Sequence, residues 1–127
     1  MEEYRQIENL IYSYAELLDE GDLVGVSKLF ENAEISAPAF SSSQIGSKEI
    51  LKMYQKSCRI YNDTGNPCTK HLTTNLIIEI DQNRASASAR SYFTVIQAVK
   101  DFPLQPIISG RYHDSFKKTD EIWEFTK

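Results

Sequence analysis

The sequence has few of the residues that would indicate a metal site or a disulfide framework. It holds two cysteines and two histidines in 127 residues. Cys58 and Cys68 lack the close spacing of a metal-binding pair, and two cysteines do not make a disulfide framework. Two histidines without suitably spaced carboxylates also make a weak metal site. We therefore expect no metal, no cofactor, and reduced cysteines in a cytoplasmic protein.

Basic clusters and long apolar runs are missing as well. The formal net charge is −4, and the lysines and arginines are scattered, which argues against a nucleic-acid partner. No apolar run approaches the roughly 20 residues of a membrane-spanning helix. The first three residues, Met-Glu-Glu, lack the basic start of a signal peptide. No nucleophile motif and no glycine-rich phosphate loop is present. We therefore expect neither a nucleic acid nor a membrane as a partner.

The composition that remains is that of an ordinary globular domain. The hydrophobic residues make up 41% of the chain and the charged residues 25%. A chain of 127 residues is long enough to bury a core without disulfides or metals. We therefore expect residues 1–127 to form a single domain.

Helical spacing of apolar residues predicts three helices in the first half of the chain, over residues 3–18, 23–30 and 48–61. Asp22 and Ser47 stand directly before the second and third helices and are expected to cap them.

The second half of the chain reads as strands. Alternating polar and apolar residues predict strands over residues 33–37, 69–81, 85–100, 106–118 and 122–126. Loops are expected at residues 38–46 and 101–105. Helices followed by long antiparallel strands indicate an α+β fold, in which the helices pack on one side of a curved sheet. The mouth of such a cone can hold a small ligand.

The strand over residues 69–81 carries the most informative polar pattern. Strict alternation places one set of residues on one face: His71, Thr73, Asn75 and Ile77. The opposite face carries Leu72, Thr74, Leu76, Ile78 and Ile80. Two interpretations stay open at this point. Either His71 and Asn75 face an enclosed polar pocket, or the sheet is ordinary and His71 faces solvent.

Asp19 is the second polar residue of interest, because it lies at the C-terminal end of the first predicted helix. The carbonyl groups at a helix C-terminus carry partial negative charge, so a carboxylate there needs a cation or a hydrogen-bond donor. The alternative is an Asp in a solvated turn.

Taken in order, these pieces resemble the SnoaL-like branch of the nuclear transport factor 2-like superfamily. The resemblance covers essentially the whole chain and rests on six short motifs: Ile7-x-x-Leu10-x-x-x-Tyr14-Ala15, Asp19-Glu20-Gly21-Asp22, Leu29-Phe30, His71-x-x-x-Asn75, Gly110-Arg111-Tyr112-x-Asp114 and Trp123-x-Phe125. It implies an α+β fold with three N-terminal helices packed on a strongly curved, mainly antiparallel sheet, which form a cone around a pocket.

The resemblance also implies a reaction. Asp19 and His71 match the catalytic Asp and the His that it orients in scytalone dehydratase, so they would form a general acid–base dyad. Leu18 stands where that enzyme has a tyrosine, and its second catalytic histidine has no clear match. Tyr14 is similar to the carbonyl-polarising tyrosine of steroid isomerases. The implied function is a lyase or isomerase acting on a cyclic, carbonyl-containing, polyketide- or steroid-like compound.

The remaining expected ligand contacts are Tyr54, Asn75 and Tyr112. For Tyr54, core packing is the alternative, because it lies in the apolar stripe of the third helix. For the Asp19–His71 pair, the alternative is a structural hydrogen bond that ties the helix to the sheet. Two other functions stay open: a non-catalytic ligand-binding or scaffold domain, and a small accessory subunit of a ring-hydroxylating dioxygenase.

The face opposite His71 predicts a homodimer. Leu72, Leu76, Ile78 and Ile80 would form an apolar surface of several hundred Å², more than a monomer normally leaves in water. The same face of a second copy, related by a two-fold axis, is the simplest cover. The alternatives are that the curved sheet folds over this face, or that the two faces are reversed.

Overall fold

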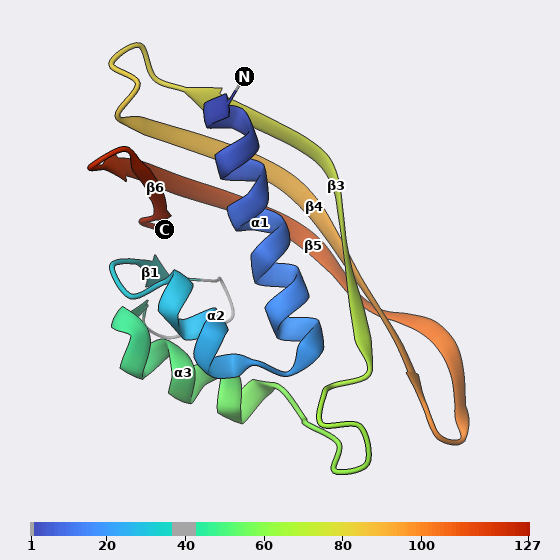
Figure 1. Ribbon diagram of the computed structural model, residues 1–127. Helices are drawn as coiled ribbons and strands as arrows, with labels where there is room; N and C mark the ends of the chain where they lie inside the picture. Colours follow the sequence, from blue (N-terminus) through green and yellow to red (C-terminus); the bar gives the residue numbers. More distant parts are fainter. Residues whose placement is uncertain (1, 37–42) are drawn as a thin grey trace.

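Three helices pack on one side of a curved four-stranded sheet in the computed structural model, which describes residues 2–36 and 43–127 (Figure 1). The helices are α1 (Glu2–Glu20), α2 (Leu23–Leu29) and α3 (Gly46–Ser57). The strands are β1 (Glu34–Ile35), β2 (Gln44–Ile45), β3 (Thr69–Ile80), β4 (Ser86–Val99), β5 (Phe102–Thr119) and β6 (Ile122–Phe125). The expected α+β class and the cover of helices on one side of the sheet are confirmed.

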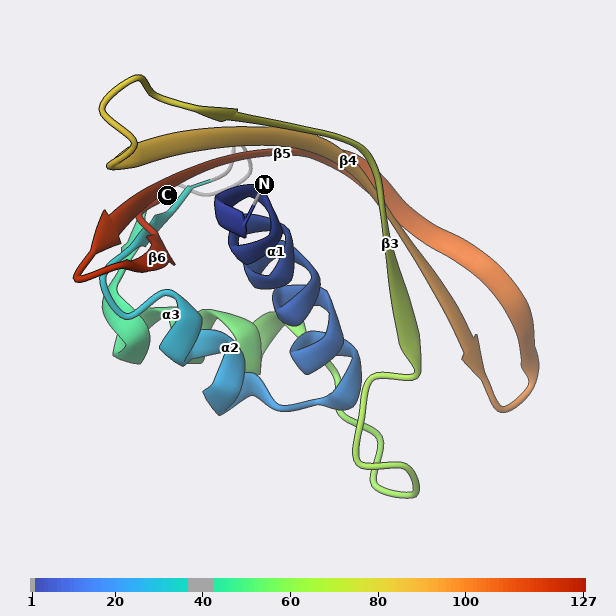
Figure 2. The same ribbon diagram turned by 45° about the horizontal axis from the view of Figure 1, so that its top comes forward.

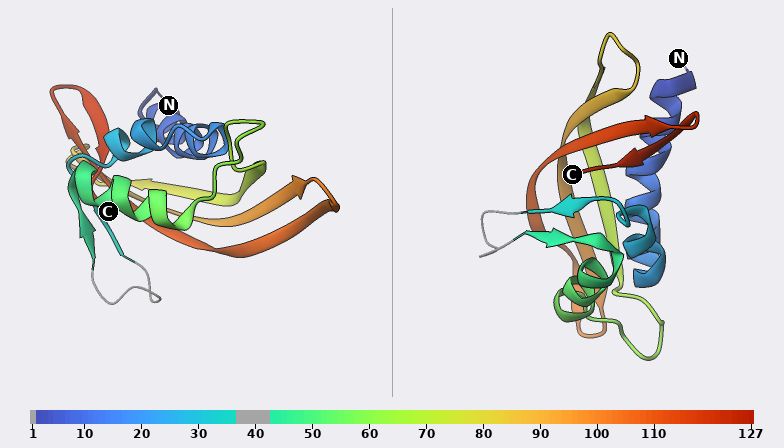
Figure 3. Two further views of the ribbon diagram at one scale, coloured as in Figure 1. Left: turned by 90° about the horizontal axis from the view of Figure 1, so that it is seen from below. Right: turned by 90° about the vertical axis from the view of Figure 1, so that its left-hand side faces the viewer.

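The large sheet is antiparallel throughout, in the order β3-β4-β5-β6. It arches around α1, as Figure 2 shows, and the view from below in Figure 3 shows the helices gathered on its concave side. A separate hairpin pairs β1 with β2. Residue 37 of the first predicted strand and residues 38–42 of the loop expected at 38–46 lie outside the described residues, and the described end of that loop forms β2 and the start of α3.

The apolar stripe of α1 faces the sheet, with Ile7, Ile11 and Leu18 all buried. The helix stops at Gly21, which has a φ of 82°. A Cβ atom there would lie 2.5 Å from the carbonyl oxygen of Gly65. Glycine is therefore required at this turn both for its backbone conformation and for space.

The ends of α2 and α3 agree only in part with the predicted ones. Asp22 caps α2 as expected, because its Oδ1 accepts a hydrogen bond of 2.8 Å from the backbone N–H of Gly25. The cap predicted for Ser47 is wrong. The residue before α3 is Ile45, which makes no side-chain cap, because the pairing of β2 with β1 sets where the helix begins. The third helix also ends earlier than predicted, at Ser57.

A β-bulge in β3 reverses the predicted alternation. Thr74 pairs with Tyr92 and Ile77 pairs with Arg90, so two residues of β3 stand opposite the single residue between those partners. Asn75, at the bulge, has a φ of 54°. Beyond it, Leu76, Ile78 and Ile80 turn inward and pack against the core, on the same face as His71. The predicted outer apolar face is therefore wrong for these three residues.

The hairpin between β4 and β5 is longer than predicted. β5 begins at Phe102, so the loop expected over residues 101–105 is largely strand, and the turn is made at Asp101, with a φ of 73°. Pro103 is tolerated there because β6 pairs only with the far end of β5 and leaves this part as a sheet edge. The hairpin extends past the helices in Figure 1, with Phe102 and Leu104 exposed. None of the helices in the described part of the chain is long and apolar enough to cross a membrane.

Candidate functional site

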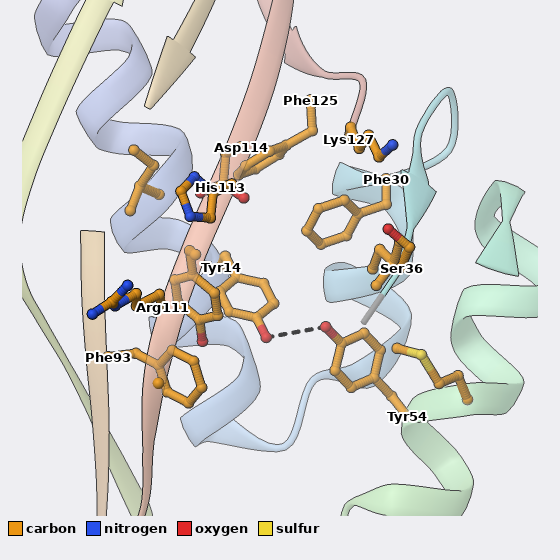
Figure 4. Close-up of a pocket in the computed structure, with 15 residues that line it drawn as sticks. Tyr14, Phe30, Ser36, Tyr54, Phe93, Arg111, His113, Asp114, Phe125 and Lys127 are labelled. Carbon is orange, nitrogen blue, oxygen red and sulfur yellow. Dashed lines mark hydrogen bonds between the residues drawn. The ribbon is translucent and has the colours of Figure 1, made fainter. Parts of the chain in front are cut away.

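A cavity of about 770 Å³ lies between the concave face of the sheet and the helices, and Figure 4 shows the side chains that line it. Its wall is mostly apolar and includes six Tyr and Phe side chains, from α1, the end of α2, α3 and three strands: Tyr14, Phe30, Tyr54, Phe93, Tyr112 and Phe125. A concave, mostly apolar space of this size with a few polar groups is typical of small-molecule sites.

Three of the aromatic residues place their hydroxyl groups in this apolar space. The hydroxyl of Tyr54 donates a hydrogen bond of 3.0 Å to that of Tyr14 (Figure 4), and the ring of Tyr112 meets that of Tyr14 edge-on, with centroids 6.0 Å apart. Burial raises the pKa of all three tyrosines well above the usual value. The hydroxyls are therefore neutral near pH 7, and they can donate hydrogen bonds but cannot serve as bases.

Tyr112 is held in place by a ring stack on the neighbouring strand. Its ring lies 4.3 Å from that of Phe93, at an interplanar angle of 14°. Gly110 makes room for this stack, because a Cβ atom there would lie 2.7 Å from the Phe93 ring. Phe93, Gly110 and Tyr112 together thus form one wall of the cavity.

Asp19 and His71 meet at the junction of α1 and β3. Nδ1 of His71 lies 2.7 Å from Oδ1 of Asp19, and the backbone N–H of His71 donates to Oδ2 over 2.8 Å. The hydroxyl of Thr69 donates to Oδ1, also over 2.8 Å. Three donors thus surround the carboxylate at the end of the helix. An ionised Asp19 places the proton of the neutral imidazole on Nδ1 and leaves Nε2 as an acceptor.

The pair adjoins the cavity without lining it. The imidazole of His71 meets the ring of Tyr14 edge-on, with centroids 6.3 Å apart. Neither Asp19 nor His71 is among the residues that line the cavity. A site that the pair shares with Tyr14 and Tyr112 therefore stays a prediction. The pair contacts the cavity wall through Tyr14.

The structure does not bring Asn75 to the site. It is exposed at the β3 bulge and does not line the cavity. The bulge explains the difference, because the predicted alternation holds only as far as Thr74. Tyr54, by contrast, is both buried against the core and in the cavity wall, so its two alternative roles are combined.

Asp114 lines the cavity and was missing from the predicted site. It lies two residues beyond Tyr112 on the inner face of β5, opposite Ala89. Burial raises the pKa of its carboxyl group to about 7. The sequence held a signal for it, because the alternation of this strand and the Gly110-Arg111-Tyr112-x-Asp114 motif put Asp114 on the face of Tyr112. We see no cluster of three or more potential metal ligands in residues 2–36 and 43–127.

The family comparison covers the whole chain. The family model described as the SnoaL-like domain matches residues 1–127. The chain belongs to the SnoaL-like domain family. No functionally curated protein matches its sequence.

Solved structures share the SnoaL-like fold. An NTF2-like protein with a cystatin-like fold from Novosphingobium aromaticivorans has a TM-score of 0.79 and 20% identity, over 98% of this chain and 78% of that one. A provisionally named scytalone dehydratase from the same organism has a TM-score of 0.75 and 28% identity, over 98% of this chain and 79% of that one. A Mycobacterium tuberculosis protein of unknown function has a TM-score of 0.77 and 23% identity, over 98% and 72%.

Proposed function

We propose that this SnoaL-like protein is a cytoplasmic small-molecule enzyme of the lyase or isomerase type, acting on a cyclic, carbonyl-containing, polyketide- or steroid-like compound. The observation that carries the proposal is the group of three neutral tyrosine hydroxyls in a mostly apolar cavity of about 770 Å³. The similarity to the provisionally named scytalone dehydratase supports a lyase reaction.

The hydroxyl groups suit a substrate that has a carbonyl oxygen. Tyr14 accepts a hydrogen bond from Tyr54 and also interacts with the hydroxyl of Tyr112, so a ligand oxygen would bind beside the Tyr14 and Tyr112 hydroxyls. Removal of a proton from the carbon next to a carbonyl group places negative charge on the oxygen. Donors that are already in place in a dry site stabilise that charge by a few kcal/mol. Tyr14 and Tyr112 are the proposed donors, and Tyr54 orients Tyr14.

Asp19 and His71 belong to the proposal as the pair that adjoins Tyr14. Asp19 fixes the imidazole ring through Nδ1, and the imidazole packs against the edge of the Tyr14 ring. We propose that the dyad contributes to catalysis through this contact, because it holds the ring of Tyr14, and with it the hydroxyl donor, in place. Replacement of Asp19 or His71 is expected to lower turnover while ligand binding in the cavity is retained.

The proposal can be tested without knowing the natural substrate. The bicyclic ketone 2-tetralone fits the expected chemistry, and exchange of its protons next to the carbonyl can be followed in D2O by proton NMR. We expect the protein to accelerate this exchange above the rate in buffer. Tyr14→Phe and Tyr112→Phe should each reduce the acceleration by about 100-fold, the effect of losing one donor to an oxyanion.

Tyr12→Phe is the matched control, because Tyr12 is on the same helix as Tyr14 but is 47% exposed. It should leave the exchange rate unchanged. Exchange no faster than in buffer would contradict the proposed function. If 2-tetralone still bound in that case, the result would favour the non-catalytic ligand-binding alternative.

A further inference from the structure

Among the acidic residues that the structure describes, Asp114 is the one that lines the cavity. Its carboxyl group is on the inner face of β5 and lines the mostly apolar cavity (Figure 4). It makes no hydrogen bond or ion pair with another residue in the described part of the chain. A half-buried carboxyl group without a protein partner is costly to keep ionised, so its place in a ligand-sized cavity calls for an explanation.

The other titratable groups around Asp114 do not offset its charge. Tyr14 from α1, Tyr54 from α3 and Tyr112 from β5 are neutral near pH 7. Arg111, His113 and Lys127 also border the cavity, but none of them forms an ion pair with Asp114 in the described residues, and the guanidinium of Arg111 lies over the ring of Tyr92. Its β4 neighbour in the sheet is an alanine. Asp114 thus stands alone as an acid in the wall that the structure describes.

We propose that Asp114 is the group that exchanges a proton with the ligand in this cavity, and hence a catalytic residue. This assignment rests on the proposed function and names its acid–base group. Two observations carry it: the carboxyl group lines the cavity and is two residues from Tyr112 on the same face, whereas His71 does not line the cavity.

The proposed step is balanced without any further reactant. The Asp114 carboxylate takes a proton from the carbon next to the carbonyl group, and the C–H electron pair forms a carbon–carbon double bond. The carbonyl π pair moves to the oxygen, which accepts hydrogen bonds from Tyr14 and Tyr112. In a β,γ-unsaturated ketone the neutral Asp114 then returns the proton to the γ carbon, and in a β-hydroxy ketone it gives the proton to the departing β-hydroxyl group, which leaves as water. In both cases the electron pair on the oxygen re-forms the carbonyl group, and the product holds a carbon–carbon double bond conjugated with it.

The protonation state of Asp114 suits both halves of this step. Burial raises its pKa to about 7, so the carboxylate and the neutral acid are both populated near neutral pH. A general base works best when its pKa lies near the working pH. His71 and Asp19 are then positioning residues, which act on the ligand through the ring of Tyr14.

Proton exchange of 2-tetralone in D2O tests the assignment through Asp114→Asn, which keeps the size of the side chain and removes its acid–base function. Wild-type exchange should rise with pH through a midpoint near 7. The variant should be slower by about 100-fold or more and should lose that midpoint. Asp120→Asn is the matched control, because Asp120 is exposed and its φ of 51° suits asparagine. It should behave as wild type.

His71→Gln separates the two candidate groups. It should slow the exchange by a smaller factor and keep the midpoint near pH 7. Loss of the midpoint in His71→Gln, together with normal exchange in Asp114→Asn, would overturn the assignment and identify His71 as the base. A wild-type protein that exchanges no proton would instead contradict the proposed function and, with it, this assignment.

A direct titration keeps the test independent of turnover. The carboxyl 13C resonance of Asp114, assigned by its loss in Asp114→Asn, should titrate with a midpoint near 7. A midpoint near 4, the value of an ordinary aspartate, would overturn the assignment even if the protein exchanged protons.

Discussion

Two aspartates near the cavity, Asp19 and Asp114, show how surroundings decide what a carboxyl group can do. Asp19 accepts hydrogen bonds from Thr69 and from the backbone and ring of His71. Asp114 lies among aromatic rings, and burial raises its pKa to about 7. The first carboxyl group is therefore fixed as an acceptor, whereas the second can change its protonation state near neutral pH.

The raised pKa of Asp114 predicts how stability depends on pH. Its folded-state pKa of about 7 exceeds the unperturbed 3.8, so the folded state binds the proton more tightly than the unfolded state. The contribution of this group is thus full below about pH 4 and is lost as the pH rises to about 7. A difference of about three pKa units limits this contribution to the free energy of unfolding to about 4 kcal/mol at most.

Asp114→Asn isolates this contribution, because the asparagine does not titrate. The free energy of unfolding of the variant minus that of wild type should increase between pH 4 and pH 8, towards the limit above. Urea unfolding at several pH values measures it. A difference that stays constant over this range would contradict the raised pKa.

Sequence patterns predicted those site residues that lie at the end of a helix or within a motif. Asp19 was found because a carboxylate at a helix C-terminus needs donors, and the structure supplies three. The hydrogen bond between Tyr54 and Tyr14 could not be predicted, because it depends on how α3 docks against α1. Asp114 could have been found, since strand alternation alone put it beside Tyr112.

At the scale of elements, the bulge in β3 had the largest consequence. The 13-residue alternation from Thr69 to Asp81 reads as an uninterrupted strand, and nothing in it requires an extra residue at Asn75. Asparagine tolerates a positive φ better than most residues, which permits a bulge without specifying one. Because a one-residue shift moves every later side chain to the other face, the whole second half of the strand was assigned to the wrong side.

Leu76 and Ile77 offer a matched pair of variants for this bulge. Leu76 packs against the core, whereas Ile77 is 45% exposed on the outer face. Leu76→Asp buries an unpaired charge and should destabilise the fold by several kcal/mol. Ile77→Asp should change the free energy of unfolding by about 0.5 kcal/mol or less, as is usual for surface positions. Thermal unfolding followed by circular dichroism compares them, and the reverse ranking would contradict the bulge.

For the whole molecule, the order of helices before strands was sufficient to predict the α+β class. The curvature of the sheet and the volume of the cavity were not predictable from periodicity, because periodicity gives the face of each residue but not how the helices dock on the sheet. The predicted dimer surface is smaller than expected, because Leu76, Ile78 and Ile80 face the core. Of the predicted members only Leu72 stays exposed, and the bulge adds Ile77 to the outer face, where Tyr92 also lies; each of the three is 45% exposed.

The homodimer stays a prediction, and it now depends on these three residues of the outer face. We expect light scattering to show a dimer at micromolar concentration, since the outer face of the sheet offers a continuous surface to a second copy. Ile77→Asp should give a folded monomer. A monomer for the wild-type protein under the same conditions would contradict the prediction.

The proposed function places a cyclic ligand in the cavity with its carbonyl oxygen among the tyrosine hydroxyls. The 13C resonance of carbonyl-labelled 2-tetralone tests this most directly, because hydrogen bonds to a carbonyl oxygen shift its carbon signal downfield. We predict a downfield shift when the ketone binds, which decreases in Tyr14→Phe and in Tyr112→Phe but not in Tyr12→Phe. A bound ketone whose carbonyl signal stays at its position in an apolar solvent would contradict hydrogen bonding by the tyrosines and, with it, the proposed function.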